Sequence, residues 1–369
     1  MMWSDKLKTL GVNIHVIATG AGANIQNELW SVPGSSAYLS GSSFPYAPEE
    51  QEETLGFMPD HFCSEIASVD LAMAAYMKAY KFAGKKPVGL GLTASVASEK
   101  IHKGDHRIYA TIITDDRVHS FETVLKKGSG AVIRKLDGSI ADDLAFFMLV
   151  DALGVSPFNS ECTAIDFRTY KDNTELARSR FFERPYFSAN GKRSAQLPNS
   201  KHWALMSGAY NPPHEGHFGI ANQVWEDFAH KTVFEITAEP PHKDGLSIQE
   251  MLKRAKSLKG YDALFTRKEP FYLDKARKFP GMPLVMGADA MLRMLDPKWG
   301  LNIIEMFKEF KRLGTKLYVS GRSVNGVITC NKDILKTVSS ELTPLYIEMT
   351  ETVTGHWDLS STEIRNRLL

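Results

Sequence analysis

The chain has 369 residues, of which 43% are hydrophobic and 24% are charged, and its formal net charge is +1. That length is enough for two domains, each with a sizeable core. A balanced charge exerts no general attraction on nucleic acid or on a membrane surface, so a bound anion must be held by a local site. The composition therefore indicates a small substrate, with neither nucleic acid nor membrane as a partner.

The cysteines and the N-terminal residues indicate in which cellular compartment the protein is expected. Cys63, Cys162 and Cys330 are far apart and show no CxxC spacing, which argues against a zinc site and against a disulfide scaffold. Residues 1–10 contain no apolar signal-peptide core, and no stretch approaches the roughly 20 apolar residues of a membrane span. We expect a soluble, cytoplasmic protein.

The first half of the chain mixes short apolar runs with longer helical patterns. Short apolar runs predict strands, and apolar residues at intervals of three and four predict helices. The predicted elements, in chain order, are a strand at Asn13–Thr19, a helix at Cys63–Phe82, strands at Val88–Thr93, Ile108–Thr114 and Ser120–Leu125, and a helix at Ile140–Leu153. Polar and basic residues then dilute the apolar pattern between Ser156 and Lys201, which marks a linker.

The second half alternates predicted strands with helical segments. The strands are expected at Trp203–Met206, Val233–Thr237, Leu284–Met286, Lys316–Ser320 and Leu345–Met349. Such alternation indicates a parallel sheet covered by helices. The expected fold class is α/β, with a first domain over 1–158, a linker over 159–200 and a second, Rossmann-like domain over 201–369.

One segment, from Ser207 to His217, reads SGAYNPPHEGH and follows the strand that begins the second domain. Helical spacing then starts at Phe218, so His214 and His217 lie at a strand-to-helix junction. Backbone N–H groups at a helix N-terminus favour anions, and imidazoles can donate hydrogen bonds to phosphate oxygens. The segment predicts a site that handles phosphates without a side-chain nucleophile.

His214-Glu215-Gly216-His217, preceded by Asn211-Pro212-Pro213, resembles the HxGH signature of the nucleotidyltransferase superfamily, and most of all that of nicotinamide- or nicotinate-mononucleotide adenylyltransferases. A second segment, LSSTEIR at 359–365, is similar to the family's ISSTxIR motif. Singly, the first could be two surface histidines in a Pro-rich turn and the second a helix-capping box. The two motifs together, in the order that the family has them, are a far more specific signal than either motif alone.

The resemblance implies an activity and a set of site residues. The 5′-phosphate of a pyridine mononucleotide would attack the α-phosphorus of ATP with Mg²⁺, giving NAD or its acid form and pyrophosphate. His214 and His217 would be catalytic, because they contact the triphosphate and its developing charge. The other nucleotide-binding residues that it implies are Ser207, Gly208, Asn211, Ser360, Ser361, Thr362 and Arg365.

Further matches to this family follow later strands. Lys243 would meet substrate phosphate, and a solvated loop lysine is the alternative. Gly287 and Asp289 resemble the family's GxD segment, in which the carboxylate would meet a ribose hydroxyl or help place Mg²⁺, although Asp289 could instead cap a helix. Arg322 resembles an arginine-bearing loop of the family, and a plain surface arginine is the alternative. Trp225 and Trp299 could stack on a ring, but packing in the core is the expected role.

The first domain has a resemblance of its own. Residues 32–41, VPGSSAYLSG, look like the VPGSSxxFxGG stretch of CinA-like nicotinamide-nucleotide amidases. The family's serine, tyrosine and lysine positions fall on Thr19, Tyr46 and Gln51. Glutamine cannot take a proton from a hydroxyl nucleophile, so we expect a degenerate amidase site. Lys85, Lys86 or Lys100 could supply the missing lysine instead.

Three other functions stay open at this point. One is a different HxGH transferase, acting on pantetheine phosphate, flavin mononucleotide or an alcohol phosphate with CTP. The second is a bifunctional enzyme that deamidates the mononucleotide and then adenylylates it, and the third is a nucleotide-sensing protein without turnover. The expected partners are ATP and a pyridine mononucleotide, and the chain is expected to form a homo-oligomer. For the first domain, either a nucleotide-binding or an oligomer-forming role stays open.

Overall fold

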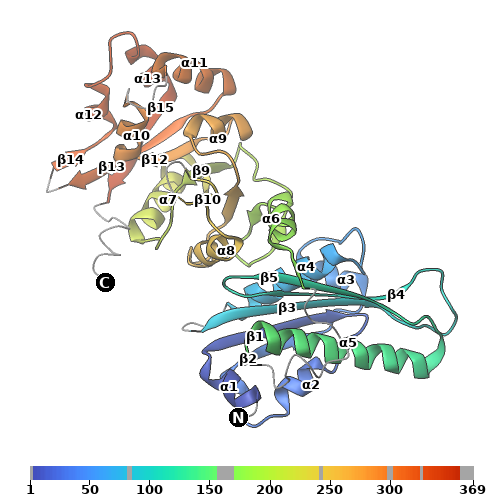
Figure 1. Cartoon of the computed structure of the whole chain (residues 1–369). Helices are drawn as coiled ribbons and strands as arrows, with labels where there is room; N and C mark the ends of the chain where they lie inside the picture. The colour runs from blue at the N-terminus through green and yellow to red at the C-terminus, as the bar shows by residue number, and fades with distance from the viewer. Residues whose placement is uncertain are drawn as a thin grey trace. The chain divides into compact units, whose positions relative to one another are not determined.

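The computed structural model describes residues 3–80, 85–155, 170–240, 244–296, 302–324 and 327–357 (Figure 1). The chain divides into two compact units, Met1–Glu183 and Arg184–Leu369. Each unit contains its own sheet with helices packed on it, which confirms the expected α/β class with two domains. The division falls inside the segment expected to be a linker. Within that segment, the described residues up to Glu183 belong to the first unit, and those from Arg184 onward belong to the second.

The sheet of the first unit is mixed. Its strand order is β2-β1-β3-β4-β5-β6; β1 pairs in parallel with β2 and β3, and the pairs from β3 to β6 are antiparallel. The strands are β1 (Val12–Thr19), β2 (Leu39–Ser43), β3 (Lys86–Ser95), β4 (His106–Ile113), β5 (Val118–Leu125) and β6 (Lys171–Asp172). The helices are α1 (Trp3–Thr9), α2 (Ile25–Trp30), α3 (Pro48–Leu55), α4 (Glu65–Ala79), α5 (Gly130–Ala152) and α6 (Thr174–Glu183), with a short 3₁₀ turn η1 at Ser35–Ala37.

Helices cover both faces of this sheet. Alternate residues of β1 point to opposite faces: Ile14 belongs to a core cluster with Leu144 of α5, and Ile17 belongs to one with Leu71 of α4. Figure 1 shows α5 and α4 on these two faces. Gly89 lets α4 approach closely, since a Cβ there would lie 2.3 Å from the carbonyl oxygen of Ala72.

The sheet of the second unit is largely parallel, as expected. Its order is β14-β13-β12-β9-β10-β11-β7-β8, with β15 beside β13. Among the described strands, the antiparallel pairs are β11-β7, β7-β8 and β13-β14, and the other pairs are parallel. The strands are β7 (Tyr186–Phe187), β8 (Arg193–Ser194), β9 (Trp203–Ser207), β10 (Lys231–Thr237), β11 (Ala263–Thr266), β12 (Leu284–Gly287), β13 (Leu317–Val324), β14 (Val327–Thr329) and β15 (Thr350–His356).

Helices again lie on both faces of this second sheet. They are α7 (Glu215–Phe228), α8 (Ile248–Lys256), α9 (Tyr272–Lys278), α10 (Ala288–Met294), α11 (Ile303–Leu313), α12 (Asn331–Leu335) and α13 (Thr343–Met349). Leu205 of β9 belongs to a core cluster with residues of α9, α10, α11 and α13, and Phe234 of β10 contacts Phe218 of α7. The order β9-β10-β11 extends the sheet in one direction and β12-β13 extends it in the other. This reversal between β9 and β12 is the place where open α/β sheets bind ligands, at the carboxyl ends of the strands.

One predicted element is wrong in type. The strand expected at Leu345–Met349 is helix α13, and the strand follows it as β15. The residues show why: Pro344 stands in the first turn, Tyr346 and Met349 are buried three positions apart, and Ile347 between them is 58% exposed. Strands β2, β6, β7, β8, β11 and β14 are also absent from the prediction, and α5 begins ten residues before the predicted start. Among the described residues, no helix is both long and apolar enough to cross a membrane.

Candidate functional site

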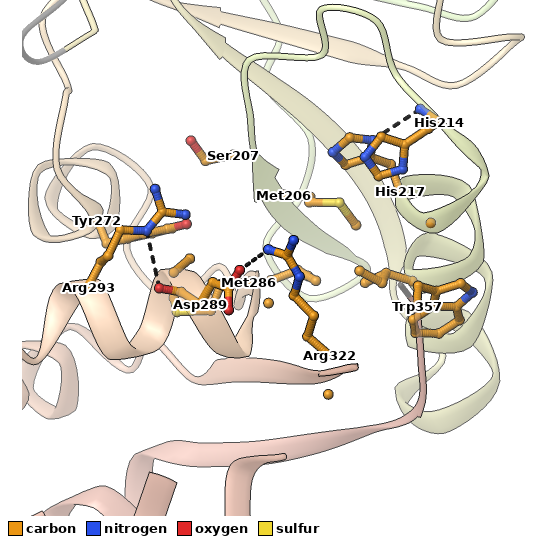
Figure 2. A pocket seen from close by; sticks show the side chains of 16 residues that line it. Met206, Ser207, His214, His217, Tyr272, Met286, Asp289, Arg293, Arg322 and Trp357 are labelled. Carbon is orange, nitrogen blue, oxygen red and sulfur yellow. Dashed lines mark hydrogen bonds and ion pairs between the residues drawn. The ribbon is translucent and has the colours of Figure 1, made fainter. Parts of the chain in front are cut away.

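A cavity of about 240 Å³ opens where the strand order of the second unit reverses (Figure 2). The ends of β9 and β12, the first turns of α7 and α10, and strand β13 contribute its walls. The lining residues are Met206, Ser207, His214, Gly216, His217, Ile220, Tyr272, Val285, Met286, Gly287, Asp289, Ala290, Arg293, Gly321, Arg322 and Trp357. The cavity therefore brings together six of the residues predicted from the sequence: Ser207, His214, His217, Gly287, Asp289 and Arg322.

The turn between β9 and α7 is held from several sides. Tyr210 is buried in a left-handed conformation with φ of 45°, and its hydroxyl donates to the carbonyl oxygen of Met206. A Cβ at Gly208 would lie 2.7 Å from the Tyr210 ring, so only glycine leaves room for it. Arg254 donates to the carbonyl oxygen of Ala209 at 2.9 Å. Gly208 thus shapes the turn without lining the cavity, and Asn211 does not line it either.

The two histidines stand at the start of α7. His214 is the N-cap residue, and its backbone N–H donates to Nδ1 of His217 at 3.2 Å. The two rings lie 3.8 Å apart between centroids. Burial, together with the neighbouring His214, lowers the pKa of His217 to about 3. A neutral ring whose Nδ1 accepts a hydrogen bond carries its proton on Nε2, so His217 is a hydrogen-bond donor at neutral pH.

Asp289 and Arg322 meet inside the cavity. A guanidinium nitrogen of Arg322, on β13, forms an ion pair with the carboxylate of Asp289, in the first turn of α10 (Figure 2). The residue at the N-cap of α10 is Gly287, so Asp289 does not cap this helix. A Cβ added to Gly287 would meet no atom within 4 Å, so its bare backbone borders open space. The pair therefore gives the cavity a guanidinium, which can bind a phosphate, and a carboxylate, which can bind a divalent metal ion.

Three polar or aromatic lining residues, Arg293, Tyr272 and Trp357, escaped the sequence analysis. Arg293 of α10 donates from Nε to the carbonyl oxygen of Asp289 at 3.2 Å. Tyr272 begins α9, and burial raises its pKa to about 12, so its hydroxyl stays protonated. Trp357 follows β15 and lies two residues before the LSSTEIR segment, which is the one signal that could have drawn attention to it.

Several predicted residues lie outside the described part of the chain. They are Lys243, Trp299, Ser360, Ser361, Thr362 and Arg365. Trp225, which was expected in the core, is instead 53% exposed on α7. Within the described ranges, no group of three or more His, Cys, Asp or Glu side chains is arranged to hold a metal ion. Asp289 is the carboxylate that a phosphate-bound Mg²⁺ would meet in the cavity.

A second cavity, of about 330 Å³, adjoins the first and shares Tyr272, Ala290 and Arg293 with it. Its remaining lining is mostly apolar and aromatic, with charged groups from α9. These residues are Pro270, Phe271, Leu273, Asp274, Arg277, Met294 and Met306. The two cavities therefore lie side by side, and Tyr272, Ala290 and Arg293 contribute to the walls of both.

The first unit brings two of its three predicted amidase positions together. The side-chain amide of Gln51 donates to the hydroxyl of Thr19 at 3.3 Å, and both residues are buried. Tyr46 is instead exposed, and its hydroxyl accepts a hydrogen bond from Arg134 at 3.0 Å. The register of β1 and β3 places Lys86 opposite Val12, at the far end of β1 from Thr19. Lys86 and its neighbour Lys85 therefore do not supply a base to Thr19.

Comparisons with known proteins agree with the sequence resemblance of the second unit. Residues 205–367 match the cytidylyltransferase-like family. No curated protein matches the chain. The matched range contains the predicted HxGH segment and all six of the cavity residues named above.

Solved structures similar to this chain correspond to its N-terminal part. One is a competence or damage-inducible protein from Enterobacter asburiae, with 13% identity, a TM-score of 0.33, and coverage of 42% of this chain and 99% of that one. Another is a CinA superfamily protein from Escherichia coli, with 10% identity, a TM-score of 0.33, and coverage of 40% and 85%. A third is the protein CihA from Agrobacterium tumefaciens, with 15% identity, a TM-score of 0.32, and coverage of 40% and 92%. It is the family match that assigns the second unit: residues 205–367 form a cytidylyltransferase-like nucleotidyltransferase domain.

Proposed function

We propose that the second unit transfers the adenylyl group of ATP to nicotinamide or nicotinate mononucleotide, with Mg²⁺, and so makes NAD or its acid form. The observation that carries this proposal is the cavity at the reversal of the strand order, where His214, His217, Asp289 and Arg322 converge. A phosphate oxygen of the mononucleotide forms a bond to the α-phosphorus, and the bond from that phosphorus to the bridging oxygen breaks. Pyrophosphate leaves with the electron pair.

The residues of the cavity match the needs of this reaction. The nucleophile is already an anion, so the protein has to align two polyanions and stabilise the charge that develops between them. His217 donates a hydrogen bond from Nε2 without carrying a charge, and Arg322 supplies a cation once a phosphate takes the place of Asp289. Mg²⁺, when bound with ATP, neutralises phosphate charge, and Asp289 is positioned to meet it.

The adjoining second cavity supports an acceptor with an aromatic ring. Phe271 and Tyr272 offer aromatic walls, and Arg293 lines both cavities. An acceptor whose ring lies in the second cavity would direct its phosphate past Arg293 toward the first. A pyridine mononucleotide has this form, with a flat ring at one end and a phosphate at the other.

The test is product formation by the purified full chain. ATP and Mg²⁺ are incubated with either mononucleotide, and pyrophosphate and dinucleotide are measured. A His217→Ala variant should lose roughly a hundredfold or more in rate, the usual cost of one transition-state donor. His202→Ala is the matched control, because His202 is exposed at the opposite end of β9 from the cavity and should leave the rate unchanged.

The family match supports a second donor for the same assay. CTP with an alcohol phosphate is therefore run beside ATP. Cytidylyl transfer without dinucleotide formation would replace the proposed reaction. If the chain binds ATP but forms no product with any acceptor, a nucleotide-sensing role without turnover would replace the proposed reaction.

A further inference from the structure

A buried polar network, made of Lys275, Thr237, Glu235 and Thr266, joins helix α9 to the ends of strands β10 and β11. Nζ of Lys275, on α9, donates to the hydroxyl of Thr237 at 2.9 Å, and that hydroxyl donates to the carboxylate of Glu235 at 2.7 Å. The hydroxyl of Thr266 donates to the same carboxylate oxygen. Lys275 is 2% exposed and Glu235 is fully buried. An ammonium and a carboxylate at this depth depend on hydrogen bonds within the protein, because water does not reach them.

Lys275 also holds the segment that precedes it. Its Nζ donates to the backbone carbonyl oxygen of Glu269, which comes before α9. Every residue between these two, from Pro270 to Asp274, lines the second cavity. One ammonium group therefore fastens both ends of this part of the cavity wall, and its bond to Thr237 ties the wall to the end of β10.

The same anchor sets the orientation of α9. Tyr272 and Lys275 are three positions apart on this helix, so their side chains project from the same side of it. Tyr272 lines both cavities. Burial, with a smaller contribution from the Glu235 carboxylate, raises the pKa of Tyr272 to about 12, so the network lies close to this hydroxyl. Fixing Lys275 therefore fixes the direction in which the Tyr272 ring leaves the helix.

Glu235 connects this wall to the turn that leads to the two histidines. It lies opposite Ser207 in the register of β9 and β10, and its backbone carbonyl accepts from the N–H of Gly208 at 3.1 Å. Glu235 thus holds the turn between β9 and α7 through its backbone and α9 through its side chain. The walls of the two cavities share this residue as a fixed point.

Apolar packing already attaches α9 to the sheet. Ala276 of α9 and Phe279 directly after it belong to a core cluster with Leu205 of β9. An apolar pair of similar volume is often as stabilising as a buried ion pair, because the two charges lose their hydration. What the polar network adds is direction, since hydrogen bonds form only within a narrow range of distances and angles.

We propose that Lys275, Thr237 and Glu235 are positioning residues for the acceptor, which hold the wall at 270–274 so that the acceptor phosphate is directed at the α-phosphorus of the donor. The proposal rests on the proposed function for the identity of the acceptor as a pyridine mononucleotide. None of these three residues lines either cavity, so they act through the wall and not by contact with substrate. Loss of the network should therefore impair use of the acceptor and spare binding of the donor.

The experiment measures the donor and the acceptor separately. Steady-state kinetics of the full chain give kcat and KM for nicotinamide and nicotinate mononucleotide, and calorimetry gives the affinity for ATP with Mg²⁺. The variants are Thr237→Val, which keeps the shape of the side chain and removes the hydroxyl, Thr237→Ser, which retains it, and the double variant Lys275→Met with Glu235→Gln. All are compared at a temperature at which circular dichroism shows each of them to be folded.

Lys278→Met is the matched control. Lys278 is on the same helix and forms an ion pair with Glu269 at 2.6 Å, but its side chain is 38% exposed and it lines neither cavity. The control therefore makes the same chemical change on the same helix without touching the buried network, and it should behave as wild type.

The expected results differ between the two substrates. Thr237→Val and the double variant should lose roughly tenfold to a hundredfold in kcat/KM for the mononucleotide, the scale of loss when a reactant is misplaced by about 1 Å. Their affinity for ATP with Mg²⁺ should stay unchanged. Thr237→Ser should recover most of the loss, because the hydroxyl again links Lys275 to Glu235.

A second measurement does not depend on the reaction. Hydrogen–deuterium exchange of the backbone amides at 271–278 reports how firmly the wall is held. Exchange there should become faster in Thr237→Val and in the double variant, and exchange in α11 should not change. Lys278→Met should leave both segments as they are in wild type.

Two results would overturn the inference. A Thr237→Val variant that keeps the kcat/KM of wild type for the mononucleotide would show that the network does not position the acceptor. Equal losses in ATP affinity and in use of the mononucleotide would assign the network to the packing of the whole second unit. If wild type makes no dinucleotide, the proposed function fails, and unchanged exchange at 271–278 in Thr237→Val would then be the separate result that refutes the positioning of the wall.

Discussion

The guanidinium of Arg322 pairs with the carboxylate of Asp289 inside the cavity of the second unit. An incoming phosphate competes with Asp289 for this guanidinium. Once displaced, the carboxylate is available to a divalent cation that arrives with the phosphates. Binding of a metal-nucleotide complex would therefore separate the pair and give each partner a new counter-charge.

Replacing Asp289 by Asn should separate the binding of phosphate by Arg322 from the binding of a divalent cation by Asp289. The variant frees Arg322, so tripolyphosphate without Mg²⁺ should bind as tightly as in wild type or several-fold more tightly. Turnover with Mg²⁺ should fall about tenfold or more, because a charged contact contributes about 1.5–3 kcal/mol. Calorimetry and the pyrophosphate assay measure the two effects. Weaker metal-free binding in Asp289→Asn would show that the ion pair supports the phosphate site instead of competing with it.

The lowered pKa of His217 should make stability depend on pH. The folded-state pKa is about 3 and the ordinary value is 6.5, so between these values the unfolded state binds the extra proton. Stability from the neutral ring is therefore fully present above about pH 6.5 and is lost as the pH falls toward 3, by up to about 1.4 kcal/mol per pH unit. Urea unfolding of wild type and His217→Gln at pH 7, 6, 5 and 4 tests this. Wild type should lose more stability than the variant, and parallel profiles would contradict the assignment.

A buried ion pair supports the second unit next to the cavity. Nζ of Lys275 lies 3.4 Å from a carboxylate oxygen of Glu235, and both side chains are almost fully buried. Lys275→Met leaves the carboxylate without its counter-charge and should cost about 3–5 kcal/mol in the free energy of unfolding. Adding Glu235→Gln removes that charge and should recover part of the loss. Urea unfolding of the single and double variants measures both steps; a double variant less stable than Lys275→Met would refute the explanation.

The contact between Thr19 and Gln51 predicts that the first unit does not hydrolyse the amide of nicotinamide mononucleotide. The hydroxyl of Thr19 meets a side-chain amide, which cannot accept its proton. An ammonia assay with the full chain should therefore give no release above the buffer. Ammonia that is produced by wild type and lost in Thr19→Val would instead establish a bifunctional enzyme.

Sequence patterns predicted β9, β10, β12 and β13 of the second sheet because these central strands are largely apolar runs, as expected for strands buried on both faces. The rule that a short apolar run is a strand failed at Leu345–Met349, since such a run has the same composition in a buried helix and in a strand. Only the side on which Tyr346 and Met349 are buried decides between the two, and that depends on tertiary packing.

The local part of the site was also predictable. His214 and His217 are three residues apart on one turn, so their proximity follows from helix geometry. Arg293, Tyr272 and Trp357 come from three other segments and meet only when the sheet has formed. Nothing local distinguishes Arg293 or Tyr272, because such side chains are common in cores and on surfaces, and Trp357 is marked only by its position two residues before the LSSTEIR segment. A Cβ at Gly219 would lie 2.2 Å from Nε1 of Trp357, and the space that this glycine leaves for the ring is visible only in three dimensions.

The neutrality of His217 has a consequence for how the site responds to ionic strength. A neutral N–H group attracts phosphate through its dipole over a short range, and dissolved salt screens such a contact far less than it screens the attraction of an exposed guanidinium. Nucleotide affinity should therefore fall with added salt only as far as the guanidinium groups of Arg322 and Arg293 contribute, and then level off. The remaining affinity at high salt would come from uncharged contacts, which would let the site tell a nucleotide from the many simple anions in its surroundings.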